Sequence, residues 1–215
     1  MHAGWASVPS DAHRARNEDA WFALPERGFF GVFDGMGGYA DGDLAARIAA
    51  EEVLEVLLPL APNAEPEAVA DTLRDALFSA DRALQTLAGS GGGTRGMGTT
   101  AVVAAVRPSE EDGVWSALVA WAGDSRALRL PAGWRALEAL TLDDGVVRLH
   151  ALSVAHARKV QATLGAVTDA RRLTLRERDY FLERNVLLQV VGTSLRHVHI
   201  AQHAVASGDR LLFVT

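Results

Sequence analysis

A carboxylate at the end of an apolar run is the first feature of the sequence that could do chemistry. Asp34 follows the apolar residues 28–33 and precedes Gly35-Met36-Gly37-Gly38. Because glycine leaves the backbone open, the Gly35 carbonyl and the Asp34 carboxylate could together bind a hard cation such as Mg²⁺ or Mn²⁺, which prefers oxygen ligands. Taken alone, this segment is better explained as a turn in which aspartate hydrogen-bonds to nearby backbone.

A second acidic pair, Glu18-Asp19, lies earlier in the chain, with Arg14 and Arg16 beside it. Two carboxylate clusters and an arginine are the groups that a two-metal phosphoryl-transfer site requires. The carboxylates hold the metals, which activate a water, and the arginine binds the phosphate through two parallel hydrogen bonds. On its own, a solvated charged turn explains this segment better.

A further carboxylate follows two apolar runs. Gly98-Thr99-Thr100 opens the first run, and the second ends in Gly123-Asp124-Ser125-Arg126. A strand, an acidic turn and another strand would place Asp124 at the edge of a sheet. The alternative is a hairpin turn, in which Gly-Asp is common.

Taken together, these segments resemble one family, the metal-dependent protein phosphatases (type 2C serine/threonine phosphatases). Six segments follow the family's order and rough spacing, namely 14–19, 34–38, 98–100, 123–126, 184–187 with Gly192, and 208–212. The resemblance covers nearly the whole chain. It implies an α+β fold, a four-layer sandwich in which two antiparallel β-sheets pack face to face and are flanked by helices. Residues 1–215 would form a single catalytic domain.

The resemblance also implies metal ligands. Asp34 would bridge two Mn²⁺ or Mg²⁺ ions, and the Gly35 carbonyl would bind one of them. Glu18 would act largely through bound water, and Asp124 would help to bind a third, weaker ion. The nucleophile would be a water molecule between the metals, with no phosphoenzyme intermediate.

Two more residues would serve the substrate and the water. Arg14 would hold the substrate phosphate, and Asp19 would hold the water network of the site. The implied substrate is a protein carrying phosphoserine or phosphothreonine, and the implied partners are a serine/threonine kinase or its targets in bacterial-type signalling. A catalytically inactive relative that binds a phosphoprotein or a regulator is the alternative.

The chain departs from the family at three places near the expected site. Bacterial-type members usually carry histidine where this chain has Tyr39. Many eukaryotic members have a histidine, thought to protonate the leaving group, where this chain has Met36. Asp143-Asp144 stands where the family usually has Asp-His. No histidine general acid is therefore evident beside the first carboxylate.

The end of the chain is the larger departure. In the family, the strand that matches 210–215 runs into an Asp-Gly whose aspartate binds metal, and another aspartate ligand follows later. Here the chain ends at Thr215 on an apolar strand. We therefore expect a sequence that lacks the C-terminal part of the domain and two metal ligands with it, so that this 215-residue form could be inactive.

Three other motifs fit less well. Gly91-x-Gly93-x-x-Gly96 matches a dinucleotide fingerprint, but a helix precedes it and a strand follows, which is the reverse of what that site needs. Ser125 stands almost in a nucleophile elbow, which would require a helix after it. His197, His199 and His203 could form a metal cluster, but polar positions on a half-buried strand explain them better.

Hydrophobic periodicity predicts the elements that must position these residues. Two helices are expected over 41–60 and 67–87 and should pack on a sheet. Strands are expected over residues 28–33, 99–106, 114–122, 126–130, 134–140, 186–191, 198–205 and 210–214. Residues 144–184 are mixed and are predicted to be helical in two pieces.

The composition excludes several classes of function. The net charge of −6 gives no basic footprint for nucleic acid. The absence of cysteine removes disulfides, thiolate zinc sites and cysteine nucleophiles. No apolar run approaches the roughly 20 residues that span a bilayer. We therefore expect a cytoplasmic protein without nucleic-acid or membrane partners.

Overall fold

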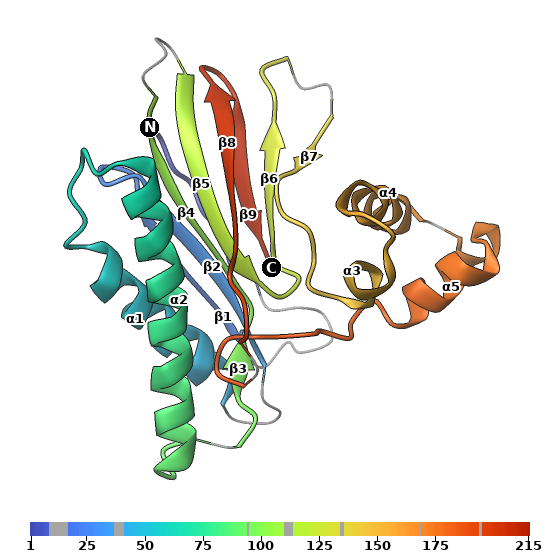
Figure 1. Cartoon of the computed structure of the whole chain (residues 1–215), viewed down its shortest axis with the longest axis horizontal. Helices are drawn as coiled ribbons and strands as arrows, with labels where there is room; N and C mark the ends of the chain where they lie inside the picture. The colour runs from blue at the N-terminus through green and yellow to red at the C-terminus, as the bar shows by residue number, and fades with distance from the viewer. Residues whose placement is uncertain are drawn as a thin grey trace.

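The structure, a computed structural model, describes residues 1–8, 17–36, 41–93, 95–109, 114–133, 136–167, 169–193 and 195–215. Arg14 and Tyr39 lie outside these described residues, so the structure does not test what the sequence predicts for them. The described elements form a helical layer, two stacked sheets and a separate group of helices (Figure 1).

The larger sheet has six antiparallel strands in the described residues, in the order β1-β2-β4-β5-β8, with β3 paired to β2. Its strands are β1 (Asp19–Leu24), β2 (Phe29–Met36), β3 (Gly98–Thr99), β4 (Ala101–Pro108), β5 (Val114–Ala122) and β8 (His199–Ala206). β4 is buried on both faces, which explains its continuous apolar run. The sequence analysis did not predict β1, in which Phe22 is buried, Trp21 is exposed and the other four residues are partly buried.

The smaller sheet packs on one face of the larger sheet. Its order is β7-β6-β9, with β6 (Arg126–Leu130), β7 (Glu138–Ala139) and β9 (Arg210–Val214). Side chains from both sheets form one apolar cluster that includes Val102, Trp121 and Ala127, with Phe213 packed against it. The α+β class and the face-to-face pair of antiparallel sheets are therefore confirmed.

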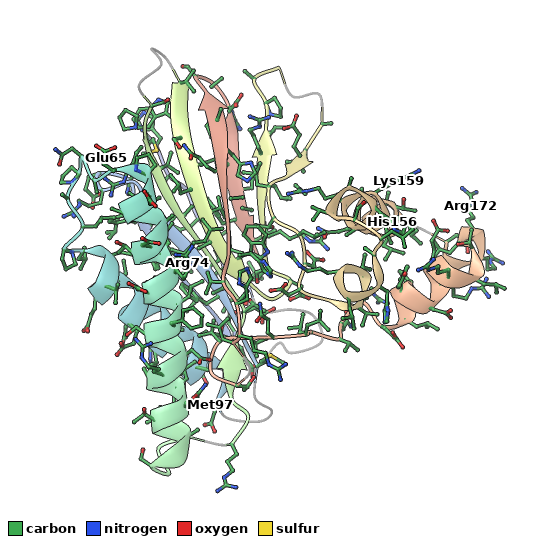
Figure 2. All side chains as sticks on the ribbon, in the orientation of Figure 1. Glu65, Arg74, Met97, His156, Lys159 and Arg172 are labelled. Atoms are coloured by element: carbon green, nitrogen blue, oxygen red, sulfur yellow. The ribbon has the colours of Figure 1, made fainter. Side chains whose placement is uncertain are left out.

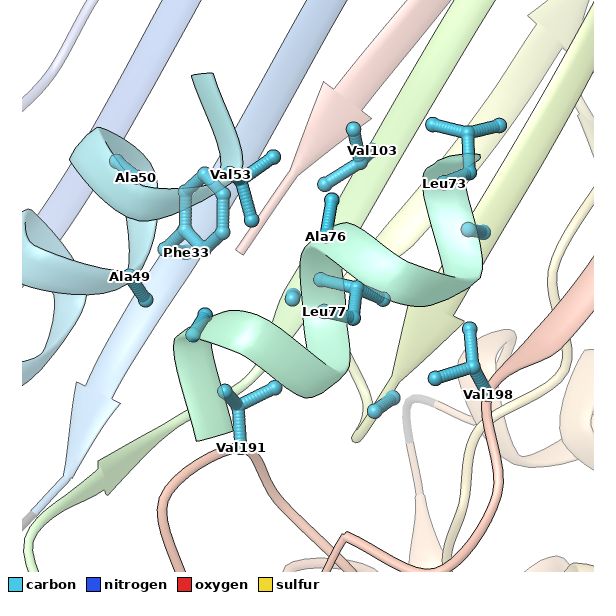
Figure 3. Packing of buried hydrophobic residues seen from close by; sticks show 14 of the residues in the cluster. Phe33, Ala49, Ala50, Val53, Leu73, Ala76, Leu77, Val103, Val191 and Val198 are labelled. Atoms are coloured by element: carbon cyan, nitrogen blue, oxygen red, sulfur yellow. The ribbon is translucent and has the colours of Figure 1, made fainter. Parts of the chain in front are cut away.

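Two helices cover the opposite face of the larger sheet, as the periodicity predicted. They are α1 (Gly42–Leu57) and α2 (Pro66–Gly89). Their fully buried residues recur every three or four positions: Ala45, Ala49, Val53 and Leu57 in α1, and Leu73, Leu77, Ala80 and Leu84 in α2. Figure 3 shows this packing, in which Phe33 and Val103 of the sheet face the helices. Each such Leu or Phe contributes about 1.5–3 kcal/mol by burial.

The remaining helices belong to an insertion, residues 146–185, between β7 and β8. It contains α3 (Val146–His150), α4 (Val154–Gly165), a short 3-10 turn (Ala170–Arg172) and α5 (Leu175–Leu182). These helices lie beside the small sheet, away from α1 and α2, and Lys159 and Arg172 mark their outer side (Figures 1 and 2). None of the helices in the described ranges is long and apolar enough to cross a membrane.

Two sequence predictions in this region are wrong. The insertion forms three α-helices and a 3-10 turn, where two helical pieces were expected. Residues 186–191 form no named strand; only isolated bridges join Val191 to Thr99 and Leu187 to Gly145. The apolar run 186–191 fits a strand, but its backbone serves as the connection that leads out of the insertion.

Of the strand predicted over 134–140, only Glu138–Ala139 is seen among its described residues.

Candidate functional site

Strand pairing brings the first acidic residues together. β1 and β2 are antiparallel, and their register places Asp19 directly opposite Asp34. Side chains of directly opposite residues lie on the same face of the sheet. Just beyond the pair, the Gly35 amide donates a hydrogen bond of 3.0 Å to the Glu18 carbonyl. The sequence-predicted residues 18, 19, 34 and 35 therefore meet at one end of the sheet.

Two glycines make room for this meeting. A Cβ atom at Gly35 would lie 1.9 Å from the Gly42 carbonyl oxygen, so no side chain fits there. A Cβ atom at Gly42 would lie 2.6 Å from Oε2 of Glu18 and 3.0 Å from the Gly35 carbonyl oxygen. The first turn of α1 thus packs directly against the Glu18 carboxylate and the Gly35 carbonyl. The sequence analysis did not identify Gly42.

The backbone of Asp34 is held by a pair of threonines. Thr100 Oγ1 accepts a hydrogen bond from the Asp34 amide (3.1 Å), and the Thr100 amide donates to the Asp34 carbonyl (2.9 Å). Thr99 Oγ1 donates to the same carbonyl oxygen (3.0 Å). The segment 98–100 was noticed in the sequence, but no role could be given to these threonines because their partner is 65 residues away.

Asp124 lies on the turn between β5 and β6. These strands belong to different sheets, so the turn is a crossing between sheets and the hairpin interpretation is wrong. Gly123, with φ of 97°, makes the turn in a conformation that other residues rarely adopt. Thr100 Oγ1 and Ser125 Oγ are 2.6 Å apart, which links the turn to the strand end that holds Asp34.

Burial and neighbouring carboxylates both disfavour a negative charge on Asp34. Burial, and then the charges of Asp19, Asp124 and Glu18, raise the pKa of Asp34 to about 6. Burial also raises the pKa of Asp19, and a hydrogen bond with Thr215 at the end of β9 partly offsets this. Unneutralised negative charge of this density is costly, and a bound cation would relieve it.

Asp124 is partly buried beside an ion pair formed by Arg126 and Asp143. Burial and Asp143 raise the pKa of Asp124, whereas Arg126 lowers it. Arg126 in turn makes two hydrogen bonds to the Asp143 carboxylate, of 2.9 and 2.6 Å. Between this group and the insertion lies a cavity of about 250 Å³, lined among others by Asp124, Arg126, Leu164 and Phe181.

The donor set fits a hard divalent cation in its chemistry. Carboxylates at positions 18, 19, 34 and 124 and an open carbonyl at position 35 are all oxygen ligands. Within the described part of the chain, no three His, Asp or Glu side chains are arranged as a ready-made metal site. The individual ligand roles of Glu18, Asp34, Gly35 and Asp124 therefore stay predictions, and Arg14 lies outside the described residues.

The residues of the three motifs that fitted less well, the nucleophile elbow, the dinucleotide fingerprint and the histidine cluster, have structural roles. Ser125 is 2% exposed and is followed by β6, not by the helix that a nucleophile elbow requires. α2 precedes the glycines of 91–96 and β3 follows them, so the order is that of a loop between helix and strand. His199 Nε2 is hydrogen-bonded to Asp144 at 2.6 Å.

Comparison with known proteins agrees with this architecture. Residues 3–144 match the family model described as protein phosphatase 2C. A human protein named probable protein phosphatase 1N is 38% identical over 127 residues, which are 56% of this chain and 27% of the human protein. The chain therefore spans about a quarter of that relative's length.

Solved structures with the same fold include two bacterial proteins. PppA, described as a key regulatory component of T6SS in Pseudomonas aeruginosa, is 27% identical, with a TM-score of 0.64 over 93% of this chain and 70% of that chain. The catalytic domain of the serine/threonine phosphatase PstP, solved with two manganese ions, is 21% identical, with a TM-score of 0.63 over 97% of this chain and 73% of that one. The family model covers well over half of the sequence, and the chain belongs to the protein phosphatase 2C family.

Proposed function

We propose that this protein hydrolyses phosphoserine and phosphothreonine in proteins, with Mn²⁺ or Mg²⁺ as cofactor. The observation that carries the proposal is the convergence of carboxylates on Asp34, whose pKa is raised to about 6 by burial and by Asp19, Asp124 and Glu18. Buried carboxylates whose charges repel one another are the form in which a protein presents a divalent metal site. Membership of the phosphatase family supports the reaction class.

The residues would share the work in the following way. Asp34 would hold two ions at the strand end that the threonine pair fixes, with the Gly35 carbonyl and Glu18 beside it. Asp124 would help to hold a third ion. When bound, the ions supply an acidified water as nucleophile and neutralise charge on the phosphate. Asp19 would accept hydrogen bonds from the water network, and Arg14 would bind the phosphate through two parallel hydrogen bonds.

The proposal extends to the protein's setting. The substrate would be a phosphorylated protein, and the opposing enzyme would be a serine/threonine kinase in cytoplasmic signalling. The solved structure of a relative described as regulatory supports a signalling context for proteins of this fold. No step requires a histidine general acid, because water can protonate the serine or threonine oxygen as its bond to phosphorus breaks.

The decisive test is metal-dependent turnover. In a form of the protein that carries the C-terminal aspartates expected from the family resemblance, we expect hydrolysis of para-nitrophenyl phosphate and of a phosphothreonine peptide in the presence of Mn²⁺ or Mg²⁺, its loss with EDTA, and no inhibition by a fluorophosphonate. Absence of turnover on both substrates with either ion would overturn the proposed function. Labelling of Ser125 by the fluorophosphonate would favour a serine hydrolase instead.

Arg14 has an internal control two residues away. Arg14→Lys should raise KM for the phosphopeptide several-fold, because lysine cannot form two parallel hydrogen bonds with the same geometry. Mn²⁺ affinity should barely change, since guanidinium is not a ligand. Arg16→Lys should have little effect on either quantity. Equal effects at both positions, or none at either, would mean that the phosphate-binding residue has been misidentified.

A further inference from the structure

A buried polar cluster lies behind the candidate site, at the base of the insertion. Its centre is Asp144, which is 2% exposed. The Asp144 carboxylate accepts hydrogen bonds from His199 Nε2 (2.6 Å), Gln189 Nε2 (3.0 Å) and the Gly123 amide (3.3 Å). The guanidinium of Arg148 is also near, with Nε 3.6 Å from Asp144 Oδ1. A buried carboxylate persists only with partners of this kind.

The orientation of the His199 ring follows from its partners. Arg148 lies 3.0 Å from His199 Nδ1, and a guanidinium can only donate. Nδ1 must therefore accept, so the ring proton is on Nε2 and is donated to Asp144. The ring also packs against Trp121 at a centroid distance of 5.3 Å. Arg148, His199 and Asp144 thus form a directed chain of hydrogen bonds from α3 through β8 to the residue behind the site.

Asp144 holds both polar groups of one backbone position. Its amide donates to the Gly123 carbonyl (2.9 Å), and its carboxylate accepts from the Gly123 amide (3.3 Å). Gly123 has φ of 97° and directly precedes Asp124. Asp144 bonds to both the carbonyl and the amide of Gly123 and so stabilises this unusual backbone conformation. It thereby helps to fix the position of the Asp124 backbone, from which the Asp124 carboxylate extends.

The same residue ties down the two ends of the insertion. The Asp144 carbonyl accepts from the Leu188 amide (2.8 Å), and Gly145 forms a bridge with Leu187. Gln189 extends this contact, since its Oε1 accepts from the Arg196 and His197 amides (3.0 and 3.1 Å). The segment before the insertion and the segment after it are therefore joined by hydrogen bonds to Asp144.

We infer that Asp144 is a positioning residue, which sets the Gly123-Asp124 turn and fixes the insertion to it. His199 and Gln189 hold its carboxylate in place. The inference rests on the proposed function only where Asp124 is taken as a metal ligand. Asp144 stands where the resembled family usually has histidine, and in this chain the imidazole comes from the opposite side, on β8.

The first test uses amide hydrogen exchange and needs no metal. Asp144→Ala removes the acceptor, and we expect exchange at the Gly123 amide to accelerate about tenfold or more. Exchange at Val103, in the centre of β4, reports opening of the whole sandwich and should change much less. Asp169, a partly exposed carboxylate in the same insertion, pairs with Arg171; Asp169→Asn is the matched control and should leave both amides unchanged. Equal acceleration at Gly123 and Val103 would show a merely structural role and overturn the inference.

A second variant keeps the test valid if the alanine variant does not fold. Asp144→Asn keeps a side-chain oxygen of nearly the same size and position that can accept from the Gly123 amide. We expect it to retain most of the Gly123 protection. An asparagine variant that folds but exchanges at Gly123 as fast as an unbonded amide would contradict the inference.

Metal titration separates this inference from the proposed function. Asp144→Ala should weaken Mn²⁺ binding several-fold, in the same direction as Asp124→Asn, and should lower kcat more than it changes KM. If the wild-type protein binds no Mn²⁺, the proposed function is wrong, while Gly123 exchange still decides whether Asp144 positions the turn. If Asp124→Asn weakens Mn²⁺ binding and Asp144→Ala does not, the positioning role is wrong and the proposed function stands.

Discussion

The sandwich and the insertion are held together in different ways. The layers formed by α1, α2 and the larger sheet share a wide apolar cluster whose members are almost all fully buried. The insertion has a cluster of three buried residues, Val146, Val160 and Tyr180. Several of its large apolar side chains are exposed instead, among them Leu152 at 85% and Leu175 at 80%. One region is stabilised by burial, and the other depends on polar contacts at its base.

This difference explains why the candidate site, whose side chains need fixed positions, lies on the sandwich. The carboxylates at 18, 19, 34 and 124 all lie on or beside strands of the sandwich, where strand register and buried threonines fix the backbone. The insertion carries eight arginine and lysine residues against four aspartate and glutamate residues, in a chain that is acidic as a whole. It contributes one wall of the cavity beside Asp124. We therefore expect changes in the sandwich to affect chemistry and global stability, and changes in the insertion to act locally.

The largest expected effect is on catalysis at the sandwich end. Asp34→Asn should abolish metal-dependent hydrolysis, because one ligand would serve both ions and their bound water would lose its acidity without them. The measurement is the rate of para-nitrophenyl phosphate hydrolysis together with Mn²⁺ titration. A variant that kept more than about a tenth of the wild-type rate, which corresponds to about 1.4 kcal/mol of barrier, would mean that Asp34 does not hold both ions.

The next largest effect is on the free energy of unfolding. It is tested by the same substitution at two leucines, one in the sandwich and one in the insertion. Leu77 in α2 is fully buried, and Leu77→Ala should lower the free energy of unfolding by about 2–5 kcal/mol. Leu175 in α5 is 80% exposed, and Leu175→Ala should change it by about 0.5 kcal/mol or less. Urea denaturation measures both. A loss at Leu175 as large as that at Leu77 would mean that the exposed leucines of the insertion are buried against something in solution.

A buried carboxylate in α2 gives a test with a pH dependence. Asp81 is 6% exposed and accepts from the Gly192 amide (2.6 Å) and Gln85 Nε2 (2.8 Å). Burial raises its pKa, although the Gly192 hydrogen bond opposes this. A raised pKa in the folded state means that the stabilisation by protonated Asp81 is complete below its unfolded pKa, near 3.9, and is lost as the pH rises through the folded value.

The prediction uses two substitutions at this position. Asp81→Asn keeps an acceptor for the Gly192 amide and has no charge to bury, so its Tm relative to wild type should rise as the pH increases from about 4 to 8. Asp81→Ala leaves the Gly192 amide unpaired and should be about 1–3 kcal/mol less stable than Asp81→Asn at all pH values. A Tm difference between the asparagine variant and wild type that stays constant with pH would contradict the raised pKa.

The parts of the fold that the sequence predicted are those with strong periodicity. The spacing of Ala45, Ala49, Val53 and Leu57 allows only one interpretation, and β5 and β6 were predicted with the observed bounds. The acidic residues of the site were found because they stand at ends of apolar runs. β1 was missed because apolar and polar residues do not alternate regularly along it, and its position depends on pairing with β2.

Long-range hydrogen bonds account for most of what could not be predicted. Nothing in the segment around Gln189 indicates that its amide meets Asp144, which is 45 residues away. The same holds for Asp81 and Gly192, which are separated by 111 residues. The insertion was poorly placed for another reason, because its helices lack a continuous apolar face. One local signal was available there: Thr174 followed three residues later by Glu177 is typical of a helix N-terminus.

That N-terminus provides the smallest expected effect. The Thr174 side chain accepts from the Glu177 amide (3.3 Å), and the Glu177 carboxylate accepts from the Thr174 amide (2.9 Å), which forms a capping box at the start of α5. Thr174→Ala should destabilise α5 by about 1 kcal/mol. In amide exchange, this corresponds to a roughly fivefold increase in the opening of α5.

Because the insertion and the sandwich have separate apolar clusters, we expect the destabilisation of α5 by Thr174→Ala to stay within the insertion. Tyr180 is the buried residue of α5, so opening of the helix exposes little apolar surface and should leave the Tm of the sandwich unchanged within about 1 °C. Thr163→Ala is the matched control: Thr163 lies inside α4, where its hydroxyl bonds to the Lys159 carbonyl, and alanine is the better helix former. Thr163→Ala should therefore not increase opening. If Thr174→Ala instead lowered the Tm of the whole protein in proportion to its local effect, the insertion and the sandwich would unfold as one unit. The conclusion that the insertion opens separately from the sandwich would then be wrong.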